Sequence, residues 1–214
     1  VLVLDDNNTG SSGIITLGGN VGADSGVASN LKSVILAGNG GVKLTGDITT
    51  SATAGAISIT GPETLNGDVI IDADAAATTV TFNSSATVNS DSTARDFEIT
   101  TDTGKISVDS VLGGLAALKS LEINDGGGNS EIDIAGIGAN NAGVAANGAT
   151  KIGNALTTKL TLDGTVYKTD DTQTYTTASG DKILITNASG ATLTTSADDI
   201  DFVGGNIQIV DTTL

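Results

Sequence analysis

The segment Leu118–Asp125, "LKSLEIND", carries the alternation of apolar and polar residues that decides the fold. Much earlier, Leu31–Ala37 reads "LKSVILA", so the triplet Leu-Lys-Ser recurs 87 positions apart. Both copies run into glycines soon after their last apolar side chain, at Gly40 and at Gly126. A segment that recurs with the same apolar face predicts similar, stacked units, each of which packs that face against its neighbour.

The composition is that of many short strands joined by turns. Apolar residues make up 38% of the 214 residues, but aromatic residues only 2%, and the chain has 29 glycines and one proline. β-Branched residues mixed with turn formers are typical of strands. The chain has no Cys, which excludes disulfides and thiolate sites, and it has no His, Met or Trp.

The charge is strongly acidic, with 9 basic and 25 acidic residues and a net charge of −16. Such a chain repels nucleic acids and anionic membrane surfaces. No stretch approaches the roughly 20 apolar residues of a membrane span. The chain starts in a predicted strand, "VLVLDD", so we expect either a mature form or a piece of something longer.

Period-two alternation recurs along the whole chain. The clearest examples are Ile57–Ile59, Phe97–Ile99 and Ile132–Ile134, in which one polar residue separates two apolar ones. Each strand is therefore predicted to have one buried and one solvated face. Two stretches are less regular: Gly113–Lys119 is predicted to make a helical turn, and 138–156 a protruding loop or short helix.

Two architectures satisfy this pattern: tandem antiparallel β-sandwiches of about 100 residues each, or one parallel β-solenoid. The recurrence at 87 residues corresponds to four coils of roughly 22 residues. Scarce aromatics also favour the solenoid. We therefore predict an all-β fold in which residues 1–214 form a single continuous solenoid of about ten coils.

The stretches Gly55–Asp91 and Ala94–Ile123 resemble the β-strand repeats of large bacterial surface proteins, the filamentous-haemagglutinin-like adhesins. Lys159–Thr186 is similar to the unit that commonly follows in such proteins. The resemblance extends from about Thr45 to the C-terminal residue, and its motifs mark a repeat style rather than an activity. It implies a right-handed parallel β-helix on the outside of a bacterial cell, serving adhesion or structure.

Candidate catalytic groups are few. A sugar-cleaving cleft needs converging carboxylates, and it usually also has basic groups and aromatic platforms for the sugar rings. The groups available are the acidic pairs Asp72–Asp74 and Asp199–Asp201, the single arginine Arg95, and the tyrosines Tyr167 and Tyr175. We predict no catalytic site and interpret the carboxylates as a solvated outer face.

Two binding chemistries stay open as alternatives. The segment Asp125–Asp133, "DGGGNSEID", is similar to the glycine-rich calcium nonapeptide, but Asn129 and Glu131 replace the expected glycine and aspartate. A single imperfect copy predicts no built metal site, so we expect no cofactor and keep calcium as the alternative. Paired threonines can match an ice or crystal lattice, but here they differ in register, and threonine also suits exposed strands. The pairs are Thr49–Thr50, Thr78–Thr79, Thr100–Thr101, Thr176–Thr177 and Thr194–Thr195.

These observations predict a non-enzymatic structural or adhesive segment of an extracellular bacterial surface protein or fibre. Its expected partners are other copies of itself, stacked end to end, or flanking repeats of the same polypeptide. Surface polysaccharides or a host or partner cell are the expected adhesion targets, and neither nucleic acid nor a membrane span is expected. A carbohydrate-active β-helix enzyme and a calcium- or lattice-binding surface protein remain the alternatives.

Overall fold

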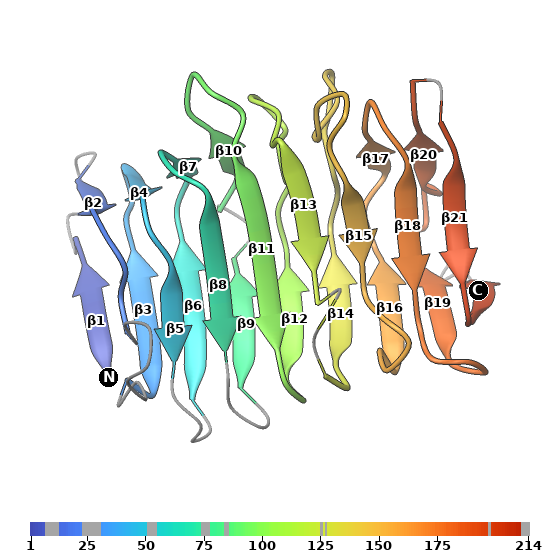
Figure 1. Cartoon of the computed structure of the whole chain (residues 1–214), viewed down its shortest axis with the longest axis horizontal. Helices are drawn as coiled ribbons and strands as arrows, with labels where there is room; N and C mark the ends of the chain where they lie inside the picture. Colours follow the sequence, from blue (N-terminus) through green and yellow to red (C-terminus); the bar gives the residue numbers. More distant parts are fainter. Residues whose placement is uncertain are drawn as a thin grey trace.

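The chain winds into a β-solenoid. The computed structural model describes residues 1–6, 13–22, 31–50, 55–73, 78–83, 86–124, 126, 128–196 and 198–210. Within these residues there are 22 strands and no helix, and the paired strands run parallel. Figure 1 shows the strands side by side along the long axis, from β1 at one end to β21 at the other. The all-β solenoid prediction is confirmed, and antiparallel sandwiches are excluded.

The strands form three faces around a common interior. The nine-stranded sheet contains β1 (Leu2–Asp5), β3 (Ser33–Ala37), β6 (Ala56–Thr60), β9 (Thr79–Phe82), β12 (Lys105–Val108), β14 (Glu131–Ile134), β16 (Lys159–Leu162), β19 (Lys182–Ile185) and β22 (Asn206–Ile209). The seven-stranded sheet contains β5 (Ile48–Thr50), β8 (Val69–Ala73), β11 (Asp96–Thr101), β13 (Ser120–Ile123), β15 (Thr150–Ile152), β18 (Gln173–Thr176) and β21 (Ile200–Val203).

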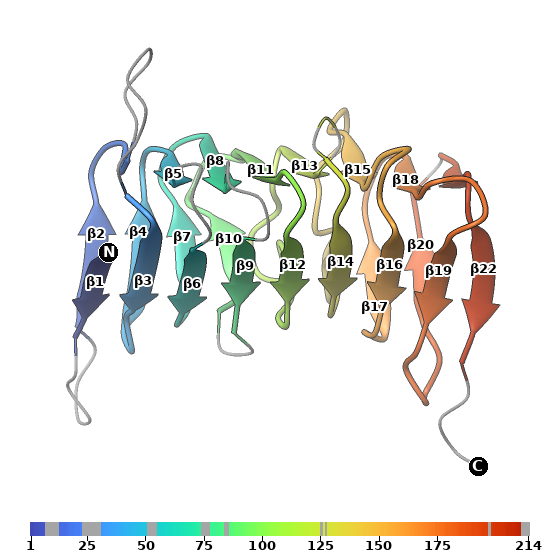
Figure 2. The same ribbon diagram turned by 90° about the horizontal axis from the view of Figure 1, so that it is seen from below.

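The third face is shorter and interrupted. It contains β2 (Ile14–Leu17), β4 (Gly41–Leu44), β7 (Glu63–Leu65) and β10 (Val88–Ser90), followed by the pair β17 (Val166–Lys168) and β20 (Thr192–Thr194). Isolated bridges at Leu112 and Ile137 connect β10 to β17, so the stacking continues between the two parts. In Figure 2, which views the solenoid from below, β2 and β4 lie at the same end as β1.

The coils are longer and fewer than predicted. In the nine-stranded sheet Val34 pairs with Ile57, which lies 23 positions later, whereas Ile132 pairs with Leu160, which lies 28 positions later. About seven turns result, each with a strand in both large sheets, so the expected ten coils are wrong. The error arose because the connections between strands vary in length, and a uniform coil of roughly 22 residues leaves too little chain for them.

The repeated phrase does not mark equivalent positions in the coil. Its first copy forms β3 in the nine-stranded sheet, whereas its second copy forms β13 in the seven-stranded sheet. The interval of 87 residues is therefore not a whole number of coils. The phrase still indicated stacked strands correctly, because a strand in either sheet needs the same alternation to bury one face.

The interior is an aliphatic column with a few aromatic rings. Ile57 and Ile59 are fully buried while Ser58 between them is half-buried, as the alternation predicts. Across the interior, the rings of Phe82 on β9 and Phe97 on β11 meet edge to face, with centroids 5.8 Å apart. The few aromatic residues are thus used where the two large sheets face each other.

The two irregular stretches both include residues of the coil. Gly113–Lys119 contains no helix, so that expectation is wrong; it includes Leu118, which is buried and forms a bridge with Val144. Within 138–156, Val144 is itself buried, and β15 pairs with β13 and β18. These parts of the predicted loop therefore lie in the wall of the solenoid.

Candidate functional site

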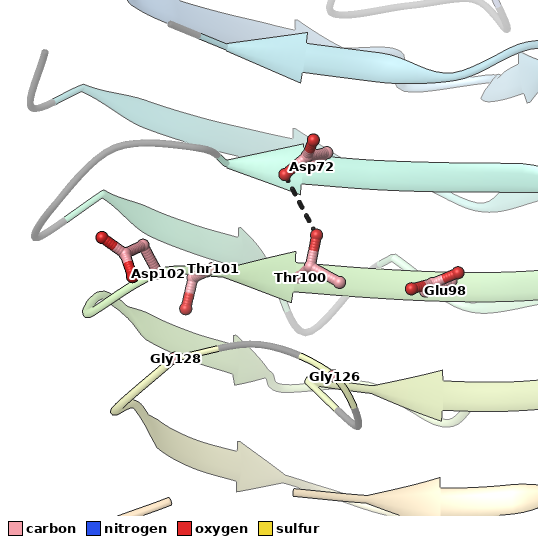
Figure 3. A pocket seen from close by; sticks show the side chains of 7 residues that line it. All are labelled: Asp72, Glu98, Thr100, Thr101, Asp102, Gly126 and Gly128. Atoms are coloured by element: carbon pink, nitrogen blue, oxygen red, sulfur yellow. Dashed lines mark hydrogen bonds between the residues drawn. The ribbon is translucent and has the colours of Figure 1, made fainter. Parts of the chain in front are cut away.

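A hollow of the described surface lies on the outer face of the seven-stranded sheet. It has a volume of about 520 Å³ and is open to solvent. Figure 3 shows Asp72, Glu98 and Thr100 on adjacent strands, with Asp102 beyond the end of β11. The residues that line it are Asp72, Glu98, Thr100, Thr101, Asp102, Gly126 and Gly128.

Strand register builds this hollow. Thr100 on β11 pairs with Asp72 on β8, and the Thr100 hydroxyl donates a hydrogen bond to Asp72 Oδ1 at 3.1 Å. Because side chains alternate along a strand, Glu98 points to the same side as Thr100. Gly128 closes one edge: a Cβ there would lie 1.8 Å from the Asp102 carbonyl oxygen, so only glycine fits.

The electrostatics of this face favour cations without creating a defined ion site. Glu98 and Glu122 are register partners, and Lys151 in the next coil lies 3.2 Å from Glu122 Oε1. Among the described residues, no group of three or more acidic side chains could hold a metal ion. The hollow is a shallow acidic surface with a hydroxyl, suited to loose contact with cations or polar ligands.

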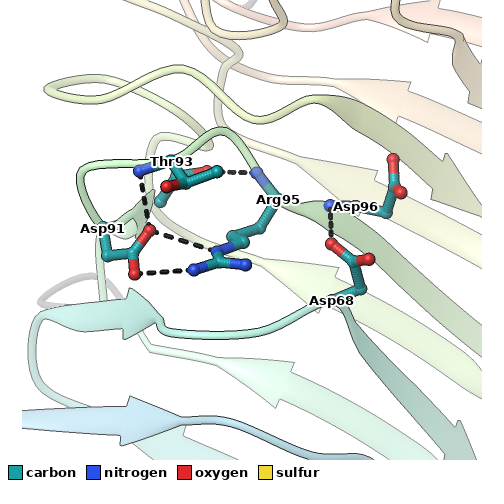
Figure 4. A network of polar contacts seen from close by, with 6 residues as sticks. Asp68, Asp91, Thr93, Arg95 and Asp96 are labelled. Carbon is teal, nitrogen blue, oxygen red and sulfur yellow. Dashed lines mark hydrogen bonds and ion pairs between the residues drawn. The ribbon is translucent and has the colours of Figure 1, made fainter.

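The single arginine is held by its own turn. The Arg95 guanidinium donates two hydrogen bonds to Asp91, from Nε at 3.1 Å and from Nη2 at 2.9 Å, and the Thr93 amide also donates to Asp91 (Figure 4). These bonds, first the one from Arg95, lower the pKa of the Asp91 carboxyl. Next to this turn, the Asp96 amide donates to Asp68 Oδ1. Arg95 therefore supports the connection from β10 to β11 and does not project into the hollow.

The described carboxylates of the candidate calcium segment pair with lysines. Asp125 and Gly127 lie outside the described residues, so the start of the motif is not placed. Glu131 lies 2.7 Å from the Lys159 ammonium, and Asp133 lies 3.4 Å from that of Lys105. Both carboxylates therefore pair with lysines of adjacent coils on the nine-stranded sheet.

The tyrosines are not available as sugar platforms. Tyr167 and Tyr175 are both completely buried. The Tyr167 hydroxyl donates to the Ile134 carbonyl and accepts from the Gly164 amide, while Tyr175 stacks on Phe202 with ring centroids 5.3 Å apart. Both rings belong to the interior of the C-terminal coils.

The acidic pairs and the threonine pairs form no common site. Asp199 and Asp201 are both exposed near β21, while Asp74 lies outside the described residues. In four of the five threonine pairs one member is buried, so the pairs do not form double rows on one outer face. The buried members are Thr50, Thr78, Thr101 and Thr177.

Gln173 and Glu63 are buried polar residues that were not predicted. Gln173 is fully buried and spans the interior: its Nε2 donates to the Tyr167 and Thr194 carbonyls, and its Oε1 accepts from the Tyr175 hydroxyl. Glu63 on β7 is 1% exposed. The signal for Glu63 was present, because period two places it on the same face as Leu65.

The comparisons with known proteins find no relative. No family model matches the chain, no curated protein matches it, and no solved structure matches it. In the part of the chain that the structure describes, no helix is long and apolar enough to cross a membrane. The resemblance to adhesins therefore stays a prediction that rests on the sequence.

Proposed function

We propose that this chain is a non-enzymatic structural and adhesive segment of an extracellular bacterial surface protein or fibre. The observation that carries the proposal is the nine-stranded parallel sheet, which runs unbroken from β1 to β22. Its backbone hydrogen bonds follow the long axis, and a rise of about 4.8 Å per strand makes the sheet roughly 40 Å long. Such a stack is a stiff rod with polar outer faces, and we propose that it is right-handed, as parallel crossovers almost always are.

The last coil supplies a second argument for a rod that is covered by further coils. Ile207 and Ile209 on β22 continue the interior columns of Ile183 and Ile185, but they are 51% and 77% exposed. Burial of an isoleucine contributes about 1.5–3 kcal/mol, so a coil stacked on β22 would gain several kcal/mol from these two side chains. The proposed cover is a β-coil, supplied by a flanking repeat or by another copy of the chain.

The first coil presents a second apolar end face. Val3 pairs with Ile35 on the outer face, and the residues that point inward are Leu2 and Leu4, whose register partners Val34 and Leu36 are fully buried. The apolar surface at this end therefore comes from Leu2 and Leu4, whereas Val3 lies on the outer face. In the proposed stack these leucines meet the β22 face of the next unit, a head-to-tail contact that does not close.

End-to-end association is tested on the 214-residue chain by light scattering after size exclusion, together with negative-stain imaging. We expect mass and rod length to increase with concentration, and the Ile207→Asp/Ile209→Asp double variant to abolish that growth. Val203→Asp is the matched control, because Val203 is 46% exposed but lies on the outer face of β21, where Thr176 is its partner. A monomer at all concentrations, or equal loss of growth in the control, would contradict association through this face.

The non-enzymatic and adhesive parts need separate measurements. Incubation with acidic and neutral polysaccharides should release no shorter sugars, whereas the same polysaccharides on a surface should retain the protein. Released oligosaccharides would favour the carbohydrate-active alternative. Retention that a Thr100→Val variant leaves unchanged would place adhesion away from the hollow.

A further inference from the structure

Glu63 occupies a position that the rest of its column fills with apolar side chains. It lies on β7, in register with Val42 on β4 and with Val88 on β10. The column continues through a bridge from Val88 to Leu112. The described neighbours along this column therefore bring no polar side chain to the Glu63 carboxyl.

Both carboxyl oxygens of Glu63 are buried and without a hydrogen-bond partner among the described residues. The charged groups on the surrounding strands lie elsewhere: Lys43 of β4 pairs with Thr64 on the outer face, and β10 carries no titratable group. In the same coil β6 has none, and Asp72 of β8 lies on the outer face beside Thr100. Within the part of the chain that the structure describes, Glu63 thus has no compensating charge.

A carboxylate in such a place is far more costly than a carboxylic acid. Removal from water penalises the ionised form strongly, and a group without a partner responds by staying protonated. Burial alone raises the pKa of Glu63 well above its ordinary value. The neutral acid is therefore the form that the closed coil accepts.

We propose that Glu63 makes the coils around β4, β7 and β10 a pH-sensitive segment, closed while its carboxyl is neutral and opening more readily as pH rises. The direction in which stability changes with pH follows from the pKa values of Glu63 in the open and closed states. In the open state Glu63 ionises near its ordinary pKa of about 4.3, whereas in the closed state it stays protonated to higher pH. Stability is complete below about pH 4.3 and is lost progressively as pH rises towards the closed-state pKa. The inference does not depend on the proposed function.

Hydrogen exchange of the whole chain, compared at each pH with Glu63→Gln, tests this device. The reporters are the Val42 amide, which bonds the Pro62 carbonyl at 2.8 Å, and the Asn66 amide, which bonds the Leu44 carbonyl at 2.7 Å. Between pH 5 and pH 8 the wild-type to variant ratio of exchange rates should rise about tenfold per pH unit while Glu63 stays protonated in the closed state.

Two controls localise the effect. At the Lys168 amide, which bonds the Ile137 carbonyl in later coils, the ratio of wild-type to Glu63→Gln exchange rates should stay constant with pH. The ratio of wild-type to Glu131→Gln exchange rates should stay constant at all reporters, because Glu131 is exposed. A ratio at Val42 and Asn66 that stays constant with pH overturns the proposal, and so does an equal rise at Lys168.

A second measurement keeps the proposal testable if Glu63→Gln fails to fold. The infrared spectrum of the wild-type chain at pH 7 should contain the carbonyl band of a protonated carboxylic acid, and Glu63→Leu should lack it. The same Glu63→Leu chain should also open no more readily at pH 8 than at pH 5. A wild-type spectrum without the protonated band at pH 7 overturns the proposal.

Discussion

Adjacent isoleucines on β8 provide a sharp test of the strand phase. Ile71 is completely buried and pairs with Ile48 and Ile99, whereas Ile70 points outward and is 41% exposed. The substitutions Ile71→Ala and Ile70→Ala remove the same atoms from the same strand. Any difference between them therefore reports which face lies inside.

The expected costs follow from the burial of each side chain. Ile71→Ala removes three carbon groups, about 2.4 kcal/mol at 0.8 kcal/mol each, and leaves a cavity, which raises the loss of unfolding free energy to about 3–4 kcal/mol. Ile70→Ala loses only partial burial and some strand propensity, about 0.5–1 kcal/mol. The difference between the two variants is therefore about 2–3 kcal/mol.

Urea unfolding followed by far-ultraviolet circular dichroism measures this difference. With a slope of about 2–3 kcal/mol per molar urea, the Ile71→Ala midpoint should fall about 1 M below that of Ile70→Ala. Equal midpoints, or a lower midpoint for Ile70→Ala, would refute the assigned face. Because a one-residue slip exchanges the two faces, that result would mean that β8 is out of register with β5 and β11.

Three further outcomes are expected. Gln173→Leu removes the partner of the buried Tyr175 hydroxyl and the side-chain donor to the Tyr167 and Thr194 carbonyls, so it should cost about 2–4 kcal/mol and lower the melting temperature by roughly 4–16 °C. The exposed control Gln208→Leu should lower it little, and an equal drop would contradict the network. Burial raises the pKa of Tyr167 and of Tyr175. The stability that depends on these neutral hydroxyls is therefore complete below about pH 10 and decreases above it. Tyrosinate absorbance should appear only together with alkaline unfolding, and a free titration near pH 10 would contradict their burial. Arg95→Ala removes an ion pair within one exposed turn and should leave the melting temperature almost unchanged at moderate salt, whereas a large drop would show that the turn stabilises the coil.

Much of the fold was predictable because the alternation within each strand specifies which of its side chains are buried. The alternation at Phe97–Ile99 and Ile132–Ile134 predicted which side chains enter the core, and the structure confirms each of them. The candidate site was less predictable. Asp72 was singled out as part of an acidic pair, but its contact with Thr100 depends on the pairing of β8 with β11, which lie 28 residues apart.

The sequence by itself determined that strands with one apolar face follow one another along the chain and stack into an all-β structure. Period two specifies the buried face of each strand, and it does so wherever that strand lies in the coil. Only the tertiary structure decided which strands share a sheet, and it separated the two Leu-Lys-Ser phrases into different sheets. It also decided which partners the inward-facing Glu63 and Gln173 meet: among the described residues the Glu63 carboxyl has none, whereas the Gln173 amide is bonded at both its nitrogen and its oxygen. The physical reason is that connections of different length change the number of residues that separate stacked partners. A side chain's neighbours therefore come from distant residues that no local pattern specifies.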